Sequence, residues 1–171
     1  AANNGDEPRW KIAMMHQDIY GSGKQHSMKV SMVNFRKGMY PVFDEYDFDV
    51  VLTGHDHTYT RSYIMKGNIA QKDSATGADG QYVNPDGTLY MTANSSSGSK
   101  YYPLCPVRGT YANVRNQFNV PSYSTISITD NDFTIKTYRT DSNSVYDECT
   151  IAKDATVSDV EDAVKKAEAV E

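Results

Sequence analysis

Three of the four histidines in this 171-residue chain stand where a metal site could form: His16, His55 and His57, with His26 nearby. Neutral imidazole is the commonest nitrogen ligand for zinc, iron and manganese. An H-x-H pair on extended backbone directs both rings to the same side, and we expect Gly54 to turn the chain sharply just before the pair. A single histidine after a strand is more often partly buried than a ligand, so the clustering carries the prediction of a metal site.

The elements that position these histidines follow a β-α-β pattern. Residues 10–15 and 49–53 are short apolar runs that predict buried strands, and each run leads into histidine. Between them, one apolar face of a predicted helix consists of Met28, Met32, Phe35 and Met39. We expect this helix to end at Gly38 and Pro41, before a second short helical stretch at 42–46. Such a unit favours parallel strands, and ligands bind beyond the carboxyl ends of parallel strands.

The remainder of the chain predicts mostly antiparallel β structure. Residues 67–87 resemble a long surface loop and 88–92 a strand. The alternating segments 124–129 and 133–138 predict a β-hairpin, and 146–151 a last strand. From Val157 onward, an apolar stripe behind a capping box predicts a separate trailing helix.

Composition excludes several classes of protein. The net charge of −5 argues against nucleic acid or an anionic membrane as a general partner. There is no run of 18 apolar residues, so we expect no membrane span, and no signal peptide is recognisable. Cys105 and Cys149 could pair as one disulfide or remain buried thiols.

The stretch Gly54-His55-Asp56-His57, after an apolar strand and with an upstream strand that ends in His16, resembles the last two motifs of the calcineurin-like metallophosphoesterases. Segments 15–21, 50–61 and 87–95 are most similar to the purple acid phosphatase branch and its bacterial cell-surface relatives. The resemblance covers roughly residues 9–152.

The resemblance implies a two-metal phosphoesterase. It assigns His16 and His55 to one metal and His57 to the other, usually Fe(III) with Zn, Mn or Fe(II), and a metal-bound hydroxide would attack phosphorus in line. The family's two phosphate-facing histidines fall at Gln25 and His26. His26 is therefore the candidate to bind phosphate or to protonate the leaving oxygen, although Ser27 beside it could equally be a plain helix N-cap. Gln25 can donate a hydrogen bond to the substrate but cannot supply a proton.

Three earlier motifs of the family are not found in this sequence: Asp-x-His, Gly-Asp-x-x-Asp and Gly-Asn-His. We therefore expect an α/β (α+β) fold that is the C-terminal half of a four-layer α/β/β/α sandwich, one βαβ unit followed by antiparallel strands. Residues 1–153 would form this part of the catalytic domain, and 154–171 a trailing helix or linker. We expect this fragment to be inactive alone and to hold at most one metal weakly, since three protein ligands suffice for zinc.

The expected partners are a phosphomonoester substrate and the missing N-terminal half of the catalytic domain, with a homodimer through exposed sheet edges as a possibility. The resemblance also implies a secreted or cell-surface bacterial protein. Two alternatives stay open: a nucleotidase or phosphodiesterase of the same superfamily, and a non-catalytic β-rich binding module whose histidines are incidental.

Overall fold

The computed structural model describes residues 8–24, 26–74, 76 and 81–154, which form two sheets and one helix. The first sheet has the order β1 (Ile12–Met14), β2 (Val50–Thr53), β6 (Thr88–Thr92), β3 (Tyr59–Lys66) and β4 (Ile69–Ala70), and β7 (Ala112–Asn116) also pairs with β3. The second sheet has the order β5 (Tyr82–Val83), β10 (Val145–Ala152), β9 (Asp132–Arg139) and β8 (Ser122–Ile128).

The predicted β-α-β unit is confirmed. Strands β1 and β2 pair in parallel, and β6 adds a third parallel strand on the other side of β2. The carboxyl ends of these strands therefore lie at one edge of the sheet. Strand β3 then returns antiparallel to β6, as the chain leaves the histidine segment.

The helix between β1 and β2 is longer than the sequence predicted. Helix α1 runs unbroken over Val30–Glu45 with Pro41 inside it, so the expected ending at Gly38 and Pro41 is wrong. Buried Phe43 continues the apolar face onto the sheet, and this packing holds the last turn helical despite the missing proline N–H. The helix is preceded by Lys29, so Ser27 is not its N-cap.

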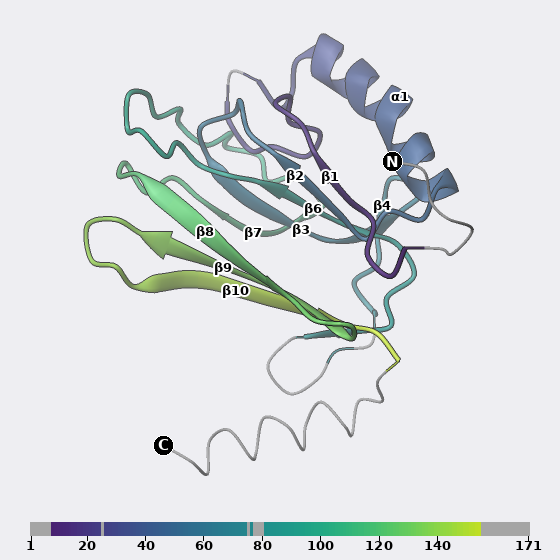
Figure 1. The fold of residues 1–171 in the computed structure, drawn as a ribbon. Helices are drawn as coiled ribbons and strands as arrows, with labels where there is room; N and C mark the ends of the chain where they lie inside the picture. The colour runs from purple at the N-terminus through teal and green to yellow at the C-terminus, as the bar shows by residue number, and fades with distance from the viewer. Residues whose placement is uncertain (1–7, 25, 75, 77–80, 155–171) are drawn as a thin grey trace.

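Figure 1 shows three layers, with α1 on one face of the first sheet and strands β8–β10 on the other. Neighbouring side chains of β2 pack on opposite faces of the first sheet, because side chains alternate along a strand. Val51 packs with Phe43 and Tyr90 under the helix, whereas Val50 packs with Phe133 between the sheets. This mixed α/β architecture is the predicted fold class.

The hairpin of β8 and β9 and the last strand β10 are also confirmed. Strands β3 and β7 were not predicted, and the expected 67–87 loop contains the short strands β4 and β5. The predicted trailing helix lies outside the described residues apart from Asp154. Among the described residues, no helix has the length and apolar character to cross a membrane.

Candidate functional site

His16 and His55 lie side by side beyond the carboxyl ends of β1 and β2. Their Nε2 and Nδ1 atoms are 3.2 Å apart, and the Gly54 N–H donates to the His16 carbonyl at 3.1 Å. Two nitrogen ligands on a tetrahedral zinc ion, each about 2.0–2.1 Å from the metal, lie about 3.3 Å apart. The pair therefore has the spacing of two ligands on one metal ion, and these two residues fit such an ion.

His57 points toward a different part of the rim. Its Nδ1 is 3.0 Å from the Lys100 carbonyl, and its ring stacks on Tyr102 with the centroids 4.9 Å apart. Because a carbonyl oxygen only accepts, Nδ1 donates in this hydrogen bond, and Nε2 is the ring nitrogen left to face another ligand. Within the described part of the chain, no three His, Cys, Asp or Glu side chains are grouped to hold one metal ion.

The expectation that His55 and His57 point to the same side rested on extended backbone, and this premise is wrong. Both residues have left-handed backbone, with φ of 64° and 49°. Gly54 is not among the residues with positive φ, so the two histidines and not the glycine carry the turn. The i, i+2 rule for strands therefore does not apply here.

His26 joins the His16–His55 pair from the loop before α1. Its ring centroid lies 4.8 Å from that of His55 and 4.8 Å from that of Tyr102. Burial lowers the pKa of His55, and the neighbouring His26 adds to this effect. Gln25, the other predicted phosphate-facing residue, lies outside the described residues.

Two buried carboxylates lie beneath the histidines, and neither was among the predicted site residues. Asp18 and Asp56 both have no exposed surface. Burial raises the pKa of Asp18 to about 6, helped by the negative charge of Asp56, and burial also raises the pKa of Asp56. Their positions two residues after His16 and between His55 and His57 were the available signal.

Gln117, directly after β7, and residues between β6 and β7 hold His57 in place, and no sequence pattern marked them. The Gln117 side chain donates to the carbonyl of His57 at 2.8 Å and to the carbonyl of Tyr102 at 2.6 Å. Together with the Lys100 carbonyl, these contacts fix the position of His57 from two segments, each more than 40 residues away in the sequence.

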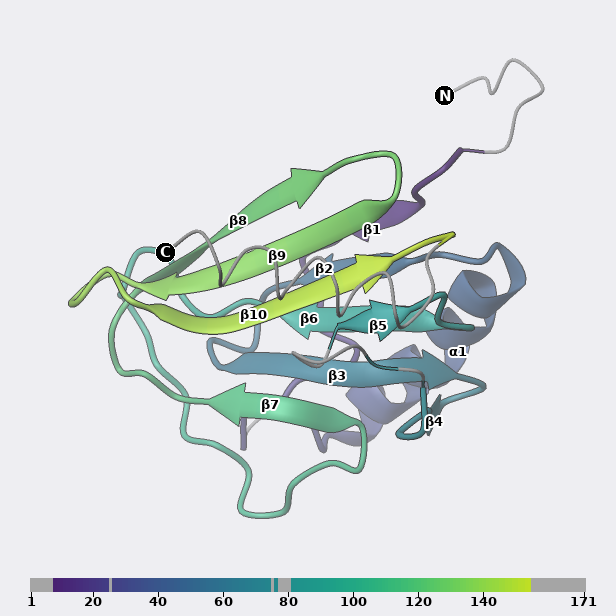
Figure 2. The same ribbon diagram turned by 90° about the horizontal axis from the view of Figure 1, so that it is seen from below.

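A groove of 630 Å³ opens between the two sheets and is bordered by His16. Its walls come from β1, β2 and β6 on one side and from β8 and β9 on the other, and they are mainly apolar, including Met14, Leu52, Met91, Ile126 and Ile135. Met14 is 80% exposed and Ile126 is 41% exposed. In Figure 2 the edge strands β1 and β8 lie toward the same side of the molecule.

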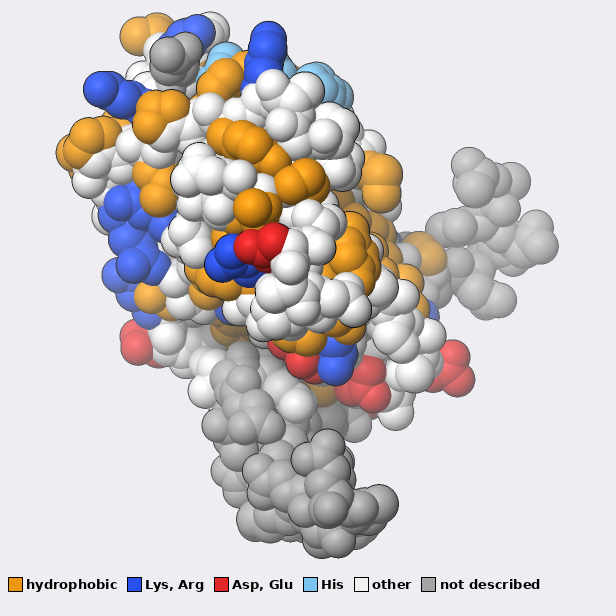
Figure 3. Space-filling view, turned by 90° about the vertical axis from the view of Figure 1, so that its left-hand side faces the viewer, with side chains coloured by type: hydrophobic (Ala, Val, Ile, Leu, Met, Phe, Trp, Pro, Cys, Tyr) orange, Lys and Arg blue, Asp and Glu red, His pale blue; other side chains and the backbone are white. Residues whose placement is uncertain are grey.

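The histidines reach the surface at one end of the molecule. Figure 3 shows their side chains at the top of the face drawn there, next to a basic side chain. His16 is exposed, whereas His26, His55 and His57 are half-buried. The cluster is therefore open to a ligand from solvent.

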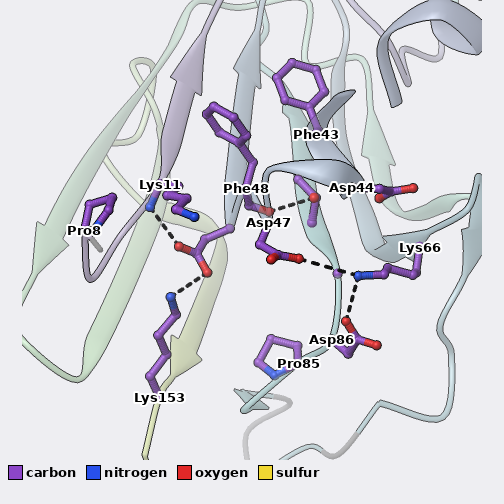
Figure 4. A pocket seen from close by; sticks show the side chains of 13 residues that line it. Pro8, Lys11, Phe43, Asp44, Asp47, Phe48, Lys66, Pro85, Asp86 and Lys153 are labelled. Atoms are coloured by element: carbon purple, nitrogen blue, oxygen red, sulfur yellow. Dashed lines mark hydrogen bonds and ion pairs between the residues drawn. The ribbon is translucent and has the colours of Figure 1, made fainter. Parts of the chain in front are cut away.

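A different pocket, of 340 Å³, lies at the amino ends of the parallel strands (Figure 4). Lys153 pairs there with Asp49 at 2.7 Å, and Lys66 pairs with Asp86 at 2.9 Å and with Asp47 at 3.8 Å. These ion pairs neutralise both lysines, so we assign them to the stability of this end of the sheet.

No family model matches the chain. Among curated proteins, an uncharacterized protein of Mycobacterium tuberculosis is 30% identical over 68 residues, 40% of this chain and 12% of that protein. A phosphoenolpyruvate phosphatase of Allium cepa is 28% identical over 93 residues, 53% of this chain and 18% of that protein. The chain thus spans less than a fifth of the length of these relatives.

Two solved structures have a similar fold. A purple acid phosphatase from yellow lupin (Lupinus luteus) seeds aligns with a TM-score of 0.66 at 18% identity, over 85% of this chain and 25% of its own. The Plasmodium protein GAP50, described as the anchor in the inner membrane complex, aligns with a TM-score of 0.59 at 15% identity, over 95% of this chain and 43% of its own. The chain has a phosphatase-like fold that corresponds to part of these longer proteins.

Proposed function

We propose that this chain is the C-terminal part of the catalytic domain of a calcineurin-like metallophosphoesterase of the purple acid phosphatase branch. The full-length protein would hydrolyse phosphomonoesters. The observation that carries the proposal is the 3.2 Å approach of His16 Nε2 and His55 Nδ1 beyond two parallel strands, on a fold shared with a purple acid phosphatase.

Each histidine has a distinct task in this proposal. His16 and His55 hold one metal ion, and His57 offers Nε2 to a second, with iron paired with zinc, manganese or iron. The ions supply charge that binds the phosphate and activates water. His26 stands next to the His16–His55 pair, where it binds a phosphate oxygen or delivers a proton to the leaving oxygen.

The groove beside His16 supports the view that more protein packs here. A 630 Å³ apolar groove with exposed Met14 and Ile126 is a surface that stable proteins normally cover. We propose that the N-terminal half of the catalytic domain covers it and brings the remaining metal ligands. Pairing of two copies through the same edges is the competing arrangement. A bacterial cell-surface or secreted location remains part of the proposal.

Zinc titration of the purified 171-residue chain tests the metal site. We expect one weak zinc site that disappears in His55→Ala and persists in Lys37→Ala, an exposed helix substitution. Equal zinc binding by the His55→Ala variant would contradict the assignment and favour a non-catalytic β-rich module.

Activity measurements test the reaction. With p-nitrophenyl phosphate, the 171-residue chain should turn over more slowly than about 1 per second, an ordinary enzyme rate, and the full-length protein should reach that rate. A panel that includes nucleotides and phosphodiesters on the full-length protein separates a phosphomonoesterase from a nucleotidase or phosphodiesterase.

A further inference from the structure

Asp56 stands between two histidines of the proposed site, yet its side chain points into the protein. It has no exposed surface, and its Oδ2 accepts hydrogen bonds from the Ser22 N–H at 2.7 Å, from the Gly23 N–H and from the Thr58 hydroxyl at 3.0 Å. Hydrogen bonds to a charged acceptor are about twice as strong as neutral ones. One carboxylate therefore joins the loop after β1 to the turn after β2.

The loop backbone rests directly on this carboxylate, and only glycine allows that approach. A Cβ built on Gly21 would lie 2.5 Å from Asp56 Oδ2 and 2.4 Å from Asp18 Oδ2. A Cβ built on Gly23 would lie 2.2 Å from Asp56 Oδ1. Real Cβ atoms do not approach oxygen so closely, so any side chain at either position would push the loop away from Asp56.

The same segment holds His26. The Gly23 carbonyl accepts the His26 N–H at 3.2 Å, and it accepts the N–H and the hydroxyl of Ser27 at 3.1 and 2.7 Å. Gly23 is thus held by Asp56 through its N–H and holds His26 through its carbonyl. A continuous series of hydrogen bonds leads from the His55–His57 turn to the His26 backbone.

We propose that Asp56 is a positioning residue that clamps the Gly21–Gly23 backbone and thereby fixes His26 beside His55. The role of His26 toward phosphate rests on the proposed function, whereas the clamp itself does not. By clamping the loop, Asp56 couples the proposed phosphate-binding side chain to a proposed metal ligand before any ligand arrives. Such preorganisation is what a positioned acid or phosphate donor requires.

Hydrogen exchange and histidine NMR on the 171-residue chain test the clamp without metal or turnover. In Asp56→Ala, we expect the Ser22 and Gly23 amides to exchange at least about thirtyfold faster, since each loses a charge-assisted hydrogen bond. The Val51 and Tyr90 amides of the central strands should keep their rates. The His26 ring signal, which lies near the rings of His55 and Tyr102, should move toward its unfolded-chain position.

Three further variants make the result specific. Asp56→Asn retains one acceptor oxygen and should keep most of the protection, with exchange less than about tenfold faster. Gly23→Ala should push the loop away from Asp56 while leaving the carboxylate in place. It should therefore reproduce the His26 shift even if Asp56→Ala fails to fold. Gly38→Ala is the matched control, since a Cβ there meets nothing within 4 Å, and it should move neither signal.

An unchanged His26 signal together with unchanged exchange at Ser22 and Gly23 in both Asp56→Ala and Gly23→Ala would overturn the clamp. If His26 moves but the full-length protein hydrolyses no phosphoester, the proposed function fails and the clamp stands. If the clamp and the proposed function are both correct, Asp56→Ala in the full-length protein should lower kcat while its zinc and iron content stays the same.

Discussion

The two sheets are joined by a buried ion pair whose loss should destabilise the whole fold. Arg61 of β3 donates from Nε to Asp147 Oδ2 at 2.6 Å and from Nη2 to Oδ1 at 3.0 Å. The Tyr59 hydroxyl also donates to Asp147 at 2.6 Å. The side chains of Arg61 and Asp147 are only 8% and 9% exposed. In Asp147→Ala, both the guanidinium and the tyrosine hydroxyl would stay buried without this acceptor.

The expected loss of unfolding free energy is large. Removing one partner of a buried pair costs about 3–5 kcal/mol, because the remaining charge is left in a medium of low polarity. A domain of this size is stable by about 5–15 kcal/mol in total. At roughly 2–4 °C for each kcal/mol, Asp147→Ala should lower Tm by roughly 6–20 °C.

Urea unfolding of the 171-residue chain, followed by circular dichroism, measures this loss. The matched control is Glu148→Ala, the next residue on β10. Glu148 pairs with Lys136 of β9 at 3.0 Å, but the two side chains are 46% and 40% exposed. Water screens that pair, so its removal should cost less than about 1 kcal/mol.

Equal losses of unfolding free energy in Asp147→Ala and Glu148→Ala, at an unchanged denaturant slope, would contradict the assignment of this loss to a buried charge. A second test uses the double variant Arg61→Met with Asp147→Leu. Replacing both charges by apolar side chains should recover part of the lost stability, because no charge then remains buried, although the Tyr59 hydroxyl still lacks its acceptor. A double variant as unstable as Asp147→Ala would locate the effect in packing and not in charge.

Four further outcomes are expected from the structure. Gly87→Ala should destabilise the fold by about 1–3 kcal/mol in thermal unfolding, since φ is 139° and a Cβ would lie 2.5 Å from the Met65 carbonyl oxygen. Both cysteines are free thiols, and Cys105 is half-buried. Burial raises the pKa of the Cys149 thiol to about 11. At pH 8 an alkylating reagent should therefore modify Cys105 before Cys149. The unfolded thiol of Cys149 loses its proton at a lower pH than the folded one, so stability should fall between about pH 9 and 11, and Cys149→Ser should flatten that slope. His16→Ala should weaken zinc binding by at least about tenfold in a calorimetric titration, and wild-type affinity would contradict the His16–His55 pair.

Local pattern was sufficient for most of the elements. The apolar runs before His16 and Gly54 form β1 and β2, and the alternation around residues 130–132 forms the β8–β9 hairpin. Strand β2 is buried as predicted and β9 alternates between buried and half-buried residues, whereas β1 is only half-buried and the apolar residues of β8 remain exposed. The local pattern therefore predicted these strands better than it predicted their burial. Strand β3 was missed because it is buried on both faces and includes Arg61, so its sequence does not alternate.

Pattern was not sufficient where distant segments meet. Pro41 lies inside α1 because Phe43 packs on the sheet, and no local rule contains that contact. Asp56 received no sequence prediction of its own, but it is the hydrogen-bond acceptor for Ser22 and Gly23, more than 30 residues earlier. These partners become neighbours only after the chain has folded.

That His16, His55 and His57 gather at one rim could be predicted from the order of residues alone, because the carboxyl ends of parallel strands lie at the same edge of a sheet. The direction in which each ring points depends on the folded backbone. Left-handed backbone at His55 and His57 sends one ring to His16 and the other to Tyr102. That backbone is locally unfavourable, and it persists because long-range contacts to Asp56, to His57 and to the His16 carbonyl hold the turn in place.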